Sequence, residues 1–276
     1  MPRSRVIAEG MLRQYTPIEN HLPYYGLWVK REDMSCLPPG PPFSKTRGVY
    51  ARVKSRDERI IGVLDTFHSQ AGHAVARACQ ILGKKCVNYY PLYKHDWELR
   101  EPQKRAQKLG ADLVGIPAGR SCILFHRARK EVEMRGGYMM PNALKLEESV
   151  EETAKEAREV DTNFQVVIIP ASSATLAAGV LRGFLQSGRA DGIRFIIHLG
   201  YSRSIDAVRR YLAEKTDEKT AARVELIDEG YSYRDKAKPG QTPPWPCNEY
   251  YDLKAFRWYL ANRESVRGRT LFWNIG

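Results

Sequence analysis

Short apolar runs alternate with charged, helix-like stretches along most of the chain, and this alternation constrains the fold more than any other feature. Runs rich in Val, Ile and Leu predict buried strands at 60–67, 85–91, 111–117, 165–170, 194–200, 224–230 and 270–275. Stretches with helical spacing lie between and after them, near 97–109 and at 71–83, 121–134, 148–160, 174–188, 204–215 and 251–263. Because nearly continuous apolar strands that alternate with helices are typical of parallel sheets covered on both faces, the sequence predicts an α/β fold.

The predicted elements fall into two series, with the second starting near residue 147. A chain of 276 residues is long enough for one large α/β domain or for two modest lobes. Two series favour two αβα lobes with mostly parallel sheets and a cleft between them. Ligands of α/β proteins bind in such clefts.

The formal net charge of +12 and the pI near 9.5 point to a polyanionic partner such as nucleic acid. The basic residues are scattered along the chain, however, which a merely soluble basic protein also shows. No apolar run approaches the roughly 20 residues that cross a bilayer, and the N-terminus lacks the apolar centre of a secretory signal. Five cysteines without a CxxC pair predict reduced thiols and a cytoplasmic protein.

Lys45 lies in the stretch GPPFSKTRG (40–48) and is the leading candidate for a catalytic residue. A lysine amine that is desolvated or close to other cations can lose its charge, and only the neutral amine attacks a carbonyl such as the aldehyde of pyridoxal phosphate (PLP). Arg47 lies two residues further on and would help to lower its pKa. The alternative is that Lys45 is one of 44 Lys and Arg residues and lies in water.

Several segments, in the same order, resemble the fold type II PLP-dependent enzymes, the tryptophan synthase β-like superfamily. The nearest branch contains aminocyclopropane-carboxylate deaminase and D-cysteine desulfhydrase. The resemblance runs from about residue 16 to the C-terminus and rests on FSKTRG (43–48), HSQAGHAVA (68–76), IPASSATLAAG (169–179), EGYSY (229–233), YDLKA (251–255) and LFWNIG (271–276). It implies PLP in the cleft, a large PLP-binding domain formed by 1–50 and 139–276, and a small domain formed by 51–138.

The resemblance also implies roles for individual residues. Lys45 would carry the cofactor as a Schiff base, and Tyr251 and Tyr231 would line the substrate side and serve in proton transfer or orientation. Asp252 would face the pyridine nitrogen and keep it protonated, although it would equally serve as a helix cap. The phosphate would lie at a strand-to-helix junction formed by Ser172, Ser173, Ala174 and Thr175, whose unpaired N–H groups favour an anion. The same residues also fit an ordinary helix cap.

The chain departs from the family pattern near residue 70. The family has serine and asparagine after glutamine, whereas Ala71 and Gly72 follow Gln70 here. Opening of a cyclopropane ring is therefore not expected, and Gly72 could leave room for a larger substrate. His73 and His68 flank this gap and could replace the lost donor, or they could be structural. The two histidines are not at metal-ligand spacing with cysteines or carboxylates, so no metal site is expected.

The sequence leaves open what is done with the carbanion that PLP chemistry would form at Cα. The favoured hypothesis is an isomerase of bacteriophage DNA hypermodification, because short relatives of this fold type occur in phages that modify thymine. Its substrate would be glycine attached to thymine in double-stranded DNA, rearranged from an N-link to a C-link. The first alternative is a lyase or deaminase of a free amino acid, like D-cysteine desulfhydrase, and the second is a non-catalytic scaffold. The family further implies a homodimer, in the host cytoplasm if the protein is viral.

Overall fold

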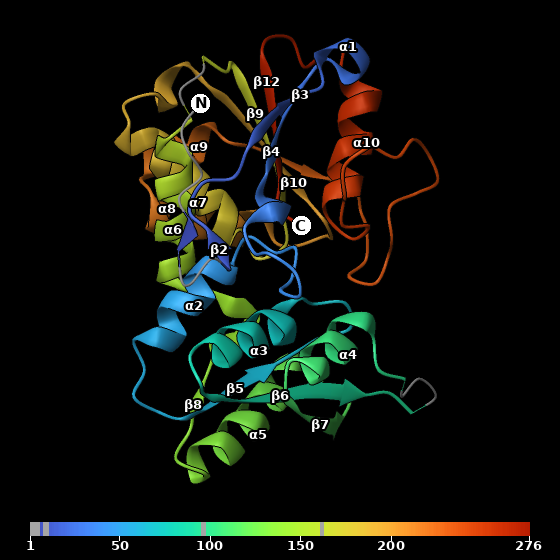
Figure 1. The fold of residues 1–276 in the computed structure, drawn as a ribbon. Helices are drawn as coiled ribbons and strands as arrows, with labels where there is room; N and C mark the ends of the chain where they lie inside the picture. The colour runs from blue at the N-terminus through green and yellow to red at the C-terminus, as the bar shows by residue number, and fades with distance from the viewer. Residues whose placement is uncertain (1–5, 8–10, 95–97, 161–162) are drawn as a thin grey trace.

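The computed structural model describes residues 6–7, 11–94, 98–160 and 163–276 of the chain. It has two lobes, each built around one sheet with helices on both faces (Figure 1). The predicted α/β class with two mostly parallel sheets is thereby confirmed.

The large lobe holds a six-stranded sheet in the order β11-β10-β9-β12-β4-β3, in which only β3 is antiparallel to its neighbour. Its strands are β3 (Ile18–Asn20), β4 (Trp28–Arg31), β9 (Val166–Ala171), β10 (Arg194–Leu199), β11 (Glu225–Asp228) and β12 (Thr270–Asn274). The helices around it are α6 (Glu147–Arg158), α7 (Thr175–Gln186), α8 (Ile205–Lys215), α9 (Glu218–Arg223) and α10 (Asp252–Asn262).

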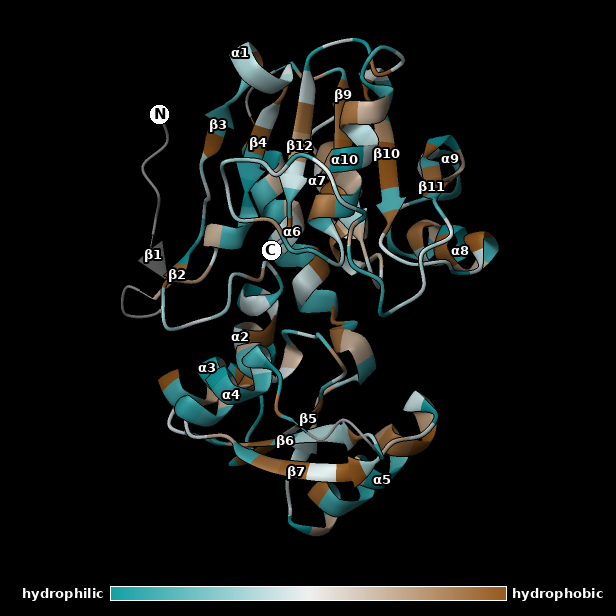
Figure 2. Cartoon of the chain, turned by 90° about the vertical axis from the view of Figure 1, so that its right-hand side faces the viewer, coloured by the Kyte–Doolittle hydropathy of each residue, from teal (hydrophilic) through white to brown (hydrophobic). Residues whose placement is uncertain are grey.

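Alternate residues of the central strands enter two different cores. Val167 and Ile169 pack in the core that contains α7, whereas Val166 and Ile168 pack in the core that contains Phe256 of α10. Successive side chains of a strand point to opposite faces, so a strand that is covered on both faces must be apolar throughout. Figure 2 shows β9 and β10 largely in brown, the hydrophobic end of its scale.

The small lobe holds a parallel four-stranded sheet in the order β7-β6-β5-β8. Its strands are β5 (Ile60–Leu64), β6 (Lys85–Leu92), β7 (Asp112–Pro117) and β8 (Tyr138–Met139). Helices α3 (Ala71–Ile81) and α4 (Glu101–Lys108) cover one face, and α5 (Ser121–Met134) covers the other (Figure 1). Strand β8 pairs with β5, so the small sheet extends one residue past the boundary predicted at 138.

Helix α2 (Thr46–Lys54) packs against α6 of the large lobe and α3 of the small lobe, and Lys45 immediately precedes it. The approach to α6 is close, because a Cβ added to Gly48 would lie 2.4 Å from the backbone of Ser149. The remaining short elements are β1 (Val6–Ile7), β2 (Leu12–Arg13), α1 (Leu22–Tyr25) and the 3-10 turns at Glu32–Met34, Asn142–Leu144 and Ala190–Gly192.

A buried ionic cluster fixes α2 to the large lobe. Arg47 of α2 pairs with Glu32, and Lys30 of β4 pairs with Glu156 of α6 at 2.6 Å. Thr16 joins the two pairs, since its hydroxyl oxygen lies 2.5 Å from a carboxyl oxygen of Glu32 and 2.8 Å from one of Glu156. Burial raises the pKa of Glu32, whereas Lys30 and Arg47 outweigh the same burial at Glu156 and lower its pKa.

The observed elements match the predicted ones closely in the alternating part of the chain. The helix predicted at 121–134 is α5 itself, and the strand predicted at 60–67 ends earlier, at Leu64. The helix predicted near 97–109 begins at Glu101, and residue 97 lies outside the described residues. Among the described segments, no helix has both the length and the apolar character that crossing a bilayer requires.

Candidate active site

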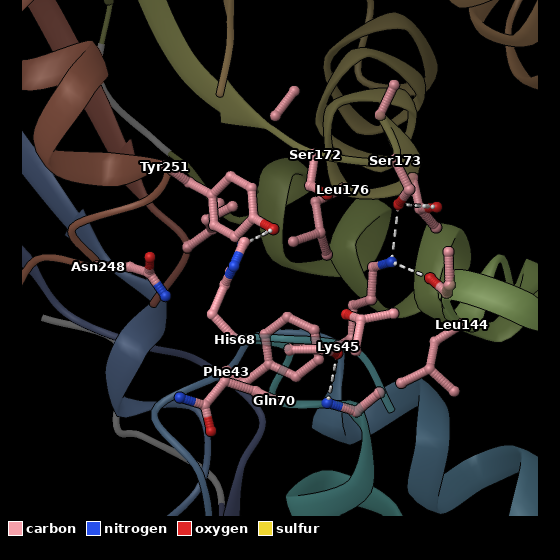
Figure 3. Close-up of a pocket in the computed structure, with 18 of the residues that line it drawn as sticks. Phe43, Lys45, His68, Gln70, Leu144, Ser172, Ser173, Leu176, Asn248 and Tyr251 are labelled. Atoms are coloured by element: carbon pink, nitrogen blue, oxygen red, sulfur yellow. Dashed lines mark hydrogen bonds between the residues drawn. The ribbon is translucent and has the colours of Figure 1, made fainter. Parts of the chain in front are cut away.

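A cavity of about 380 Å³ lies where the two lobes meet, and both lobes contribute to its wall (Figure 3). The small lobe supplies Leu64, Thr66, His68, Ser69, Gln70, Ala71 and Ser121. The rest of the chain supplies Phe43, Lys45, Asn142, Ala143, Leu144, the whole segment 170–177, Tyr201, Tyr233, Asn248, Tyr251, Ile275 and Gly276.

Lys45 reaches into this cavity from the start of α2 (Figure 3). Its Nζ donates to Ser173 Oγ at 2.8 Å and to the carbonyl oxygen of Ala143 at 2.9 Å. Burial lowers the pKa of Lys45 to about 7, and the positive charges of Lys145 and Arg203 lower it further. At neutral pH part of this amine is therefore uncharged and able to attack a carbonyl.

The other buried lysines are placed differently. Lys30 is paired with Glu156, and Lys254 donates to the carbonyl oxygen of Gly200 while its Nζ lies 4.3 Å from the ring centroid of Tyr231. Neither of them lines the cavity. Of the lysines in the described residues, Lys45 is the one that combines burial, a lowered pKa and access to the cavity.

The lowered pKa of Lys45 predicts how fast the protein takes up PLP at different pH. Below about pH 7 the amine is protonated and cannot attack the aldehyde, so the rate of uptake should rise as the pH rises through about 7 and then level off. Stopped-flow absorbance of the cofactor mixed with apoprotein measures this rate. For an unperturbed lysine with a pKa of about 10.4, the rate of reaction with the aldehyde continues to rise well above pH 7. A rate of uptake by the protein that rises in the same way would contradict the assignment of Lys45 as the reacting amine.

The segment ASSAT (171–175) lies beside Lys45 and has features that favour an anion. It joins the carboxyl end of β9 to the N-terminus of α7, where the first backbone N–H groups of a helix have no helical partner. The hydroxyls of Ser173 and Thr175 lie 2.9 Å apart and line the cavity. The positive charges of Arg203 and Lys145 act on the same region, as their effect on Lys45 shows.

Ala174 in this segment has the left-handed backbone conformation, with φ 62° and ψ 4°. A non-glycine residue in that conformation costs about 1–2 kcal/mol. The chain therefore keeps the backbone turn for which glycine is better suited, at a position where the resembling family has glycine. A strained backbone conformation at the N-terminus of a helix, beside a buried amine, is characteristic of a ligand-binding loop.

Asp252, predicted to face the pyridine nitrogen, lies in the layer behind the cavity wall. It is fully buried, and one carboxyl oxygen accepts from the backbone N–H of Ile275 at 2.7 Å. Its other oxygen has no partner among the described residues. Burial raises the pKa of Asp252 to about 7, and the nearby Asp33 raises it further, so a cationic ring nitrogen would be a favourable partner for this oxygen.

The two predicted tyrosines are placed differently. Tyr251 lines the cavity, and its hydroxyl lies 2.8 Å from His68 Nε2 (Figure 3). Tyr231 is buried outside the cavity wall, against Lys254. Tyr233, two residues further along the same loop, reaches the cavity instead, and Tyr201 is the second tyrosine that the sequence analysis did not single out. The motif EGYSY contains both Tyr231 and Tyr233, so the sequence also offered Tyr233 as the tyrosine that lines the cavity.

The segment after Gln70 is packed more tightly than its sequence suggests. Gln70 lines the cavity, whereas Gly72 and His73 do not. A Cβ at Gly72 would lie 2.1 Å from Asn88 Nδ2 and 2.7 Å from Asp65 Oδ2, so the missing side chain makes room for these residues and not for a larger substrate. His73 is held by the carbonyl oxygen of Pro39, 2.9 Å from its Nε2.

The arrangement fits PLP on several independent grounds. A buried amine with a lowered pKa suits the aldehyde, and the strand-to-helix junction beside it suits the phosphate. The unpartnered oxygen of Asp252 would suit the ring nitrogen, although Asp252 does not line the cavity. Within the described residues, no group of three or more His, Cys, Asp or Glu residues is close enough to hold a metal ion.

Comparisons with known proteins agree with this chemistry. Residues 11–237 match the family model described as pyridoxal-phosphate dependent enzyme. The chain is 46% identical to a protein of Pseudomonas phage M6 named glycyl-dTMP PLP-dependent decarboxylase, over 96% of this chain and 100% of that protein.

Solved structures share the fold at low sequence identity. A homologue of ACC deaminase matches with a TM-score of 0.79 at 17% identity, over 99% of this chain and 91% of that one. Threonine deaminase isoform 2 from Solanum lycopersicum matches with a TM-score of 0.69 at 16% identity, over 98% of this chain and 81% of that one. The predicted fold type and cofactor are thereby confirmed. The chain belongs to the family of pyridoxal-phosphate dependent enzymes.

Proposed function

We propose that this protein is a PLP-dependent decarboxylase that removes CO2 from the glycyl group of glycyl-dTMP. The proposal is supported by the name of the phage M6 protein, to which this chain is 46% identical over nearly the full length of both. The anticipated substrate, glycine attached to thymine, has the same chemistry. The proposed reaction breaks the bond between Cα and the carboxylate carbon, which the anticipated isomerisation leaves intact.

Bound PLP supplies an electron sink for the pair of electrons that remains on Cα when one of its bonds breaks. Lys45 would hold the cofactor until the amino group of the substrate replaces it, after which the Lys45 amine is free to accept or donate a proton. Ser173 and Thr175, with the N-terminus of α7, would hold the phosphate. Asp252 would hold the ring nitrogen in its protonated form.

The charge of the cavity wall is the observation that favours loss of CO2. Of the described residues that line the cavity, Lys45 is the one with a cationic side chain, and burial lowers the pKa of His68 to about 3, so that it is neutral. Among these residues no guanidinium lines the cavity to pair with the substrate carboxylate, so burial of that carboxylate is costly, and its departure as neutral CO2 removes the cost. An arginine that clamped the carboxylate would stabilise the starting state and hinder the reaction.

Aromatic side chains in the wall suit the nucleotide part of the substrate. Tyr201 and Tyr233 are half-buried, and their rings meet edge to face with centroids 5.1 Å apart. Every nucleobase has a π face that stacks on such rings. Arg234 is exposed next to Tyr233 and lies over the rings of Phe67 and Tyr93, where its guanidinium can meet a phosphate.

The proposal is tested by incubating the PLP-loaded protein with glycyl-dTMP and measuring the molecular mass of the product by mass spectrometry. A product lighter by one CO2 is expected, with no turnover of free glycine. A product of unchanged mass would instead indicate the isomerase, and equal turnover of free D-cysteine or serine would indicate a lyase of free amino acids. A colourless protein that takes up no PLP would indicate a scaffold. The same adduct within a DNA duplex, compared with the free nucleotide, tests whether DNA is the substrate.

A further inference from the structure

A group of aromatic and basic side chains lies directly outside the cavity wall, where the two lobes meet. Tyr233 of the large lobe and Thr66 of the small lobe both line the cavity, and their hydroxyl oxygens are 2.5 Å apart. The next residue in each segment, Arg234 and Phe67, does not line the cavity. The guanidinium carbon of Arg234 lies 4.8 Å from the ring centroid of Phe67, so the group continues from the wall towards the surface.

Arg234 is an exposed cation that two rings of the small lobe hold in place. Its guanidinium carbon also lies 4.3 Å from the ring centroid of Tyr93, and no carboxylate of the described residues pairs with it. The adjacent Asp235 accepts a hydrogen bond from the backbone N–H of Ser232 at 2.6 Å. Because the face of the guanidinium covers the rings, the N–H groups at its edge can bind a ligand, and their fork matches two oxygens of a phosphate.

Arg100 brings a second guanidinium to the same ring. It precedes α4, and its guanidinium carbon lies 4.4 Å from the ring centroid of Phe67. Gln103 of α4 donates to the carbonyl oxygen of Thr66 at 3.3 Å, which ties the start of this helix to the cavity wall. Two guanidinium groups against one ring make the local potential more positive and so attract an anion. Because Arg234 already rests on the rings, it loses little conformational freedom when the anion binds.

The size and charge of the cavity place the phosphate of a nucleotide substrate outside it. Cavities that hold one drug-sized molecule measure about 300–1,000 Å³, so a cavity of about 380 Å³ has little room left once it holds PLP and a glycyl group. A phosphate buried there would also be costly, since Lys45 is the one cationic side chain among the described lining residues. Arg203 is also near the cavity, but it donates to the carbonyl oxygen of Ser172 and so belongs to the segment 171–175.

We propose that Arg234, held on Phe67 and Tyr93, binds the phosphate of a thymidine nucleotide and makes the enzyme select nucleotides over nucleosides. This inference rests on the proposed function, in which the ring of Tyr233 next to Arg234 stacks on the base. The phosphate can belong to a free nucleotide or to DNA, because both present anionic oxygens. Arg234 is remote from the bond that breaks, so it contributes to affinity and not to the chemical step.

The first test measures binding and needs no turnover. Isothermal titration of the PLP-loaded protein, at fixed low ionic strength, compares dTMP with thymidine. The wild type should bind dTMP about 10-fold or more tightly than thymidine, and Arg234→Met should bind the two equally, because a charge-assisted hydrogen bond to the phosphate is lost. Arg234→Lys should keep part of the preference, since it keeps the charge without the fork.

A matched control removes a positive charge from the same loop. Lys236 is exposed and pairs with Glu249 at 2.7 Å, so Lys236→Met should retain the preference for dTMP. A wild type that binds dTMP and thymidine equally, or binds neither, would overturn the proposal. A preference that survives in Arg234→Met, or that Lys236→Met abolishes to the same extent, would overturn it as well.

A competition experiment identifies the source of the phosphate. An unmodified thymine-containing DNA duplex is added to protein that is saturated with dTMP. Displacement of dTMP from the wild type, with a weaker effect on Arg234→Met, indicates a phosphate of DNA. No displacement, together with the Arg234-dependent preference for dTMP, indicates the free nucleotide. Either result supports a phosphate site, whereas displacement that is equal in the wild type and in Arg234→Met contradicts it.

The second test uses turnover of glycyl-dTMP and of glycyl-thymidine, which lacks the phosphate. Arg234→Met should raise KM for glycyl-dTMP by about 10-fold with kcat nearly unchanged, and should leave both constants for glycyl-thymidine as in the wild type. An equal loss with both substrates would show that Arg234 only supports the fold, and would contradict the proposal.

The outcomes separate this inference from the proposed function. A wild type that releases no CO2 from glycyl-dTMP defeats the proposed function, and the binding of dTMP against thymidine still decides whether Arg234 binds a phosphate. A wild type that decarboxylates glycyl-dTMP and glycyl-thymidine with the same kcat/KM defeats the phosphate site and leaves the proposed function intact.

Discussion

Replacing Lys45 by alanine is expected to lower turnover of glycyl-dTMP by more than about 10³-fold, the largest effect of any single substitution in the chain. The change removes the amine that we propose holds the cofactor and exchanges a proton with Cα. The fold should persist, because Lys45 is not part of the ionic cluster that fixes α2. Steady-state turnover measures the loss, and circular dichroism checks the fold.

Two further variants show whether chemistry or charge is lost. Lys45→Arg restores a positive charge but has no amine that becomes neutral near pH 7, so it should be as inactive as the alanine variant. Lys54→Ala removes an exposed lysine at the end of the same helix and should turn over like the wild type. Appreciable activity in Lys45→Arg would mean that position 45 supplies only charge.

Replacing Arg47 by methionine is expected to destabilise the protein by about 3–5 kcal/mol, since it leaves a buried carboxylate without its cation. Arg47 is 3% exposed, and its partner Glu32 is fully buried. Helix α2 begins beside Lys45, so PLP affinity should weaken together with stability. Urea unfolding of the wild type and the variant measures the difference.

The pH dependence of this difference follows from the same pairing. Burial raises the pKa of Glu32 even in the presence of Arg47, and removal of the cation raises it further. The folded variant then binds a proton more tightly than the unfolded chain does, so the variant regains stability as the pH falls. Arg129→Met is the control, because it breaks an exposed pair with Glu133 and should leave the stability nearly unchanged. An equally small effect of Arg47→Met would contradict the role given to the cluster.

The alternating part of the fold could be predicted from sequence because each strand is buried on both faces. Runs such as VVII (166–169) of β9 are apolar at every position, which is typical of a strand in a parallel sheet that is covered on both faces. The helices between such strands keep one apolar face. The segment that precedes β5 gave no such signal. Strand β4 is only four residues long, and α2 is stabilised by contacts with α6 and by buried charges that lie far apart in sequence.

The site could be predicted where backbone geometry fixes it and not where loops decide it. Lys45 and the segment 171–175 adjoin the ends of regular elements, and both line the cavity. Whether Tyr231 or Tyr233 enters the cavity depends on the path of a loop without periodicity. The tight packing at Gly72 depends on Asn88, which lies on a neighbouring strand and whose approach no local pattern shows.

The most direct test of this account is to reduce the PLP-loaded protein with borohydride, digest it, and locate the phosphopyridoxyl group by mass spectrometry. The account predicts a single modified peptide that carries the group on Lys45. A modification on another lysine, such as the buried Lys254, or a protein that is not modified at all, would contradict the central claim that the Lys45 amine holds the cofactor in the cleft.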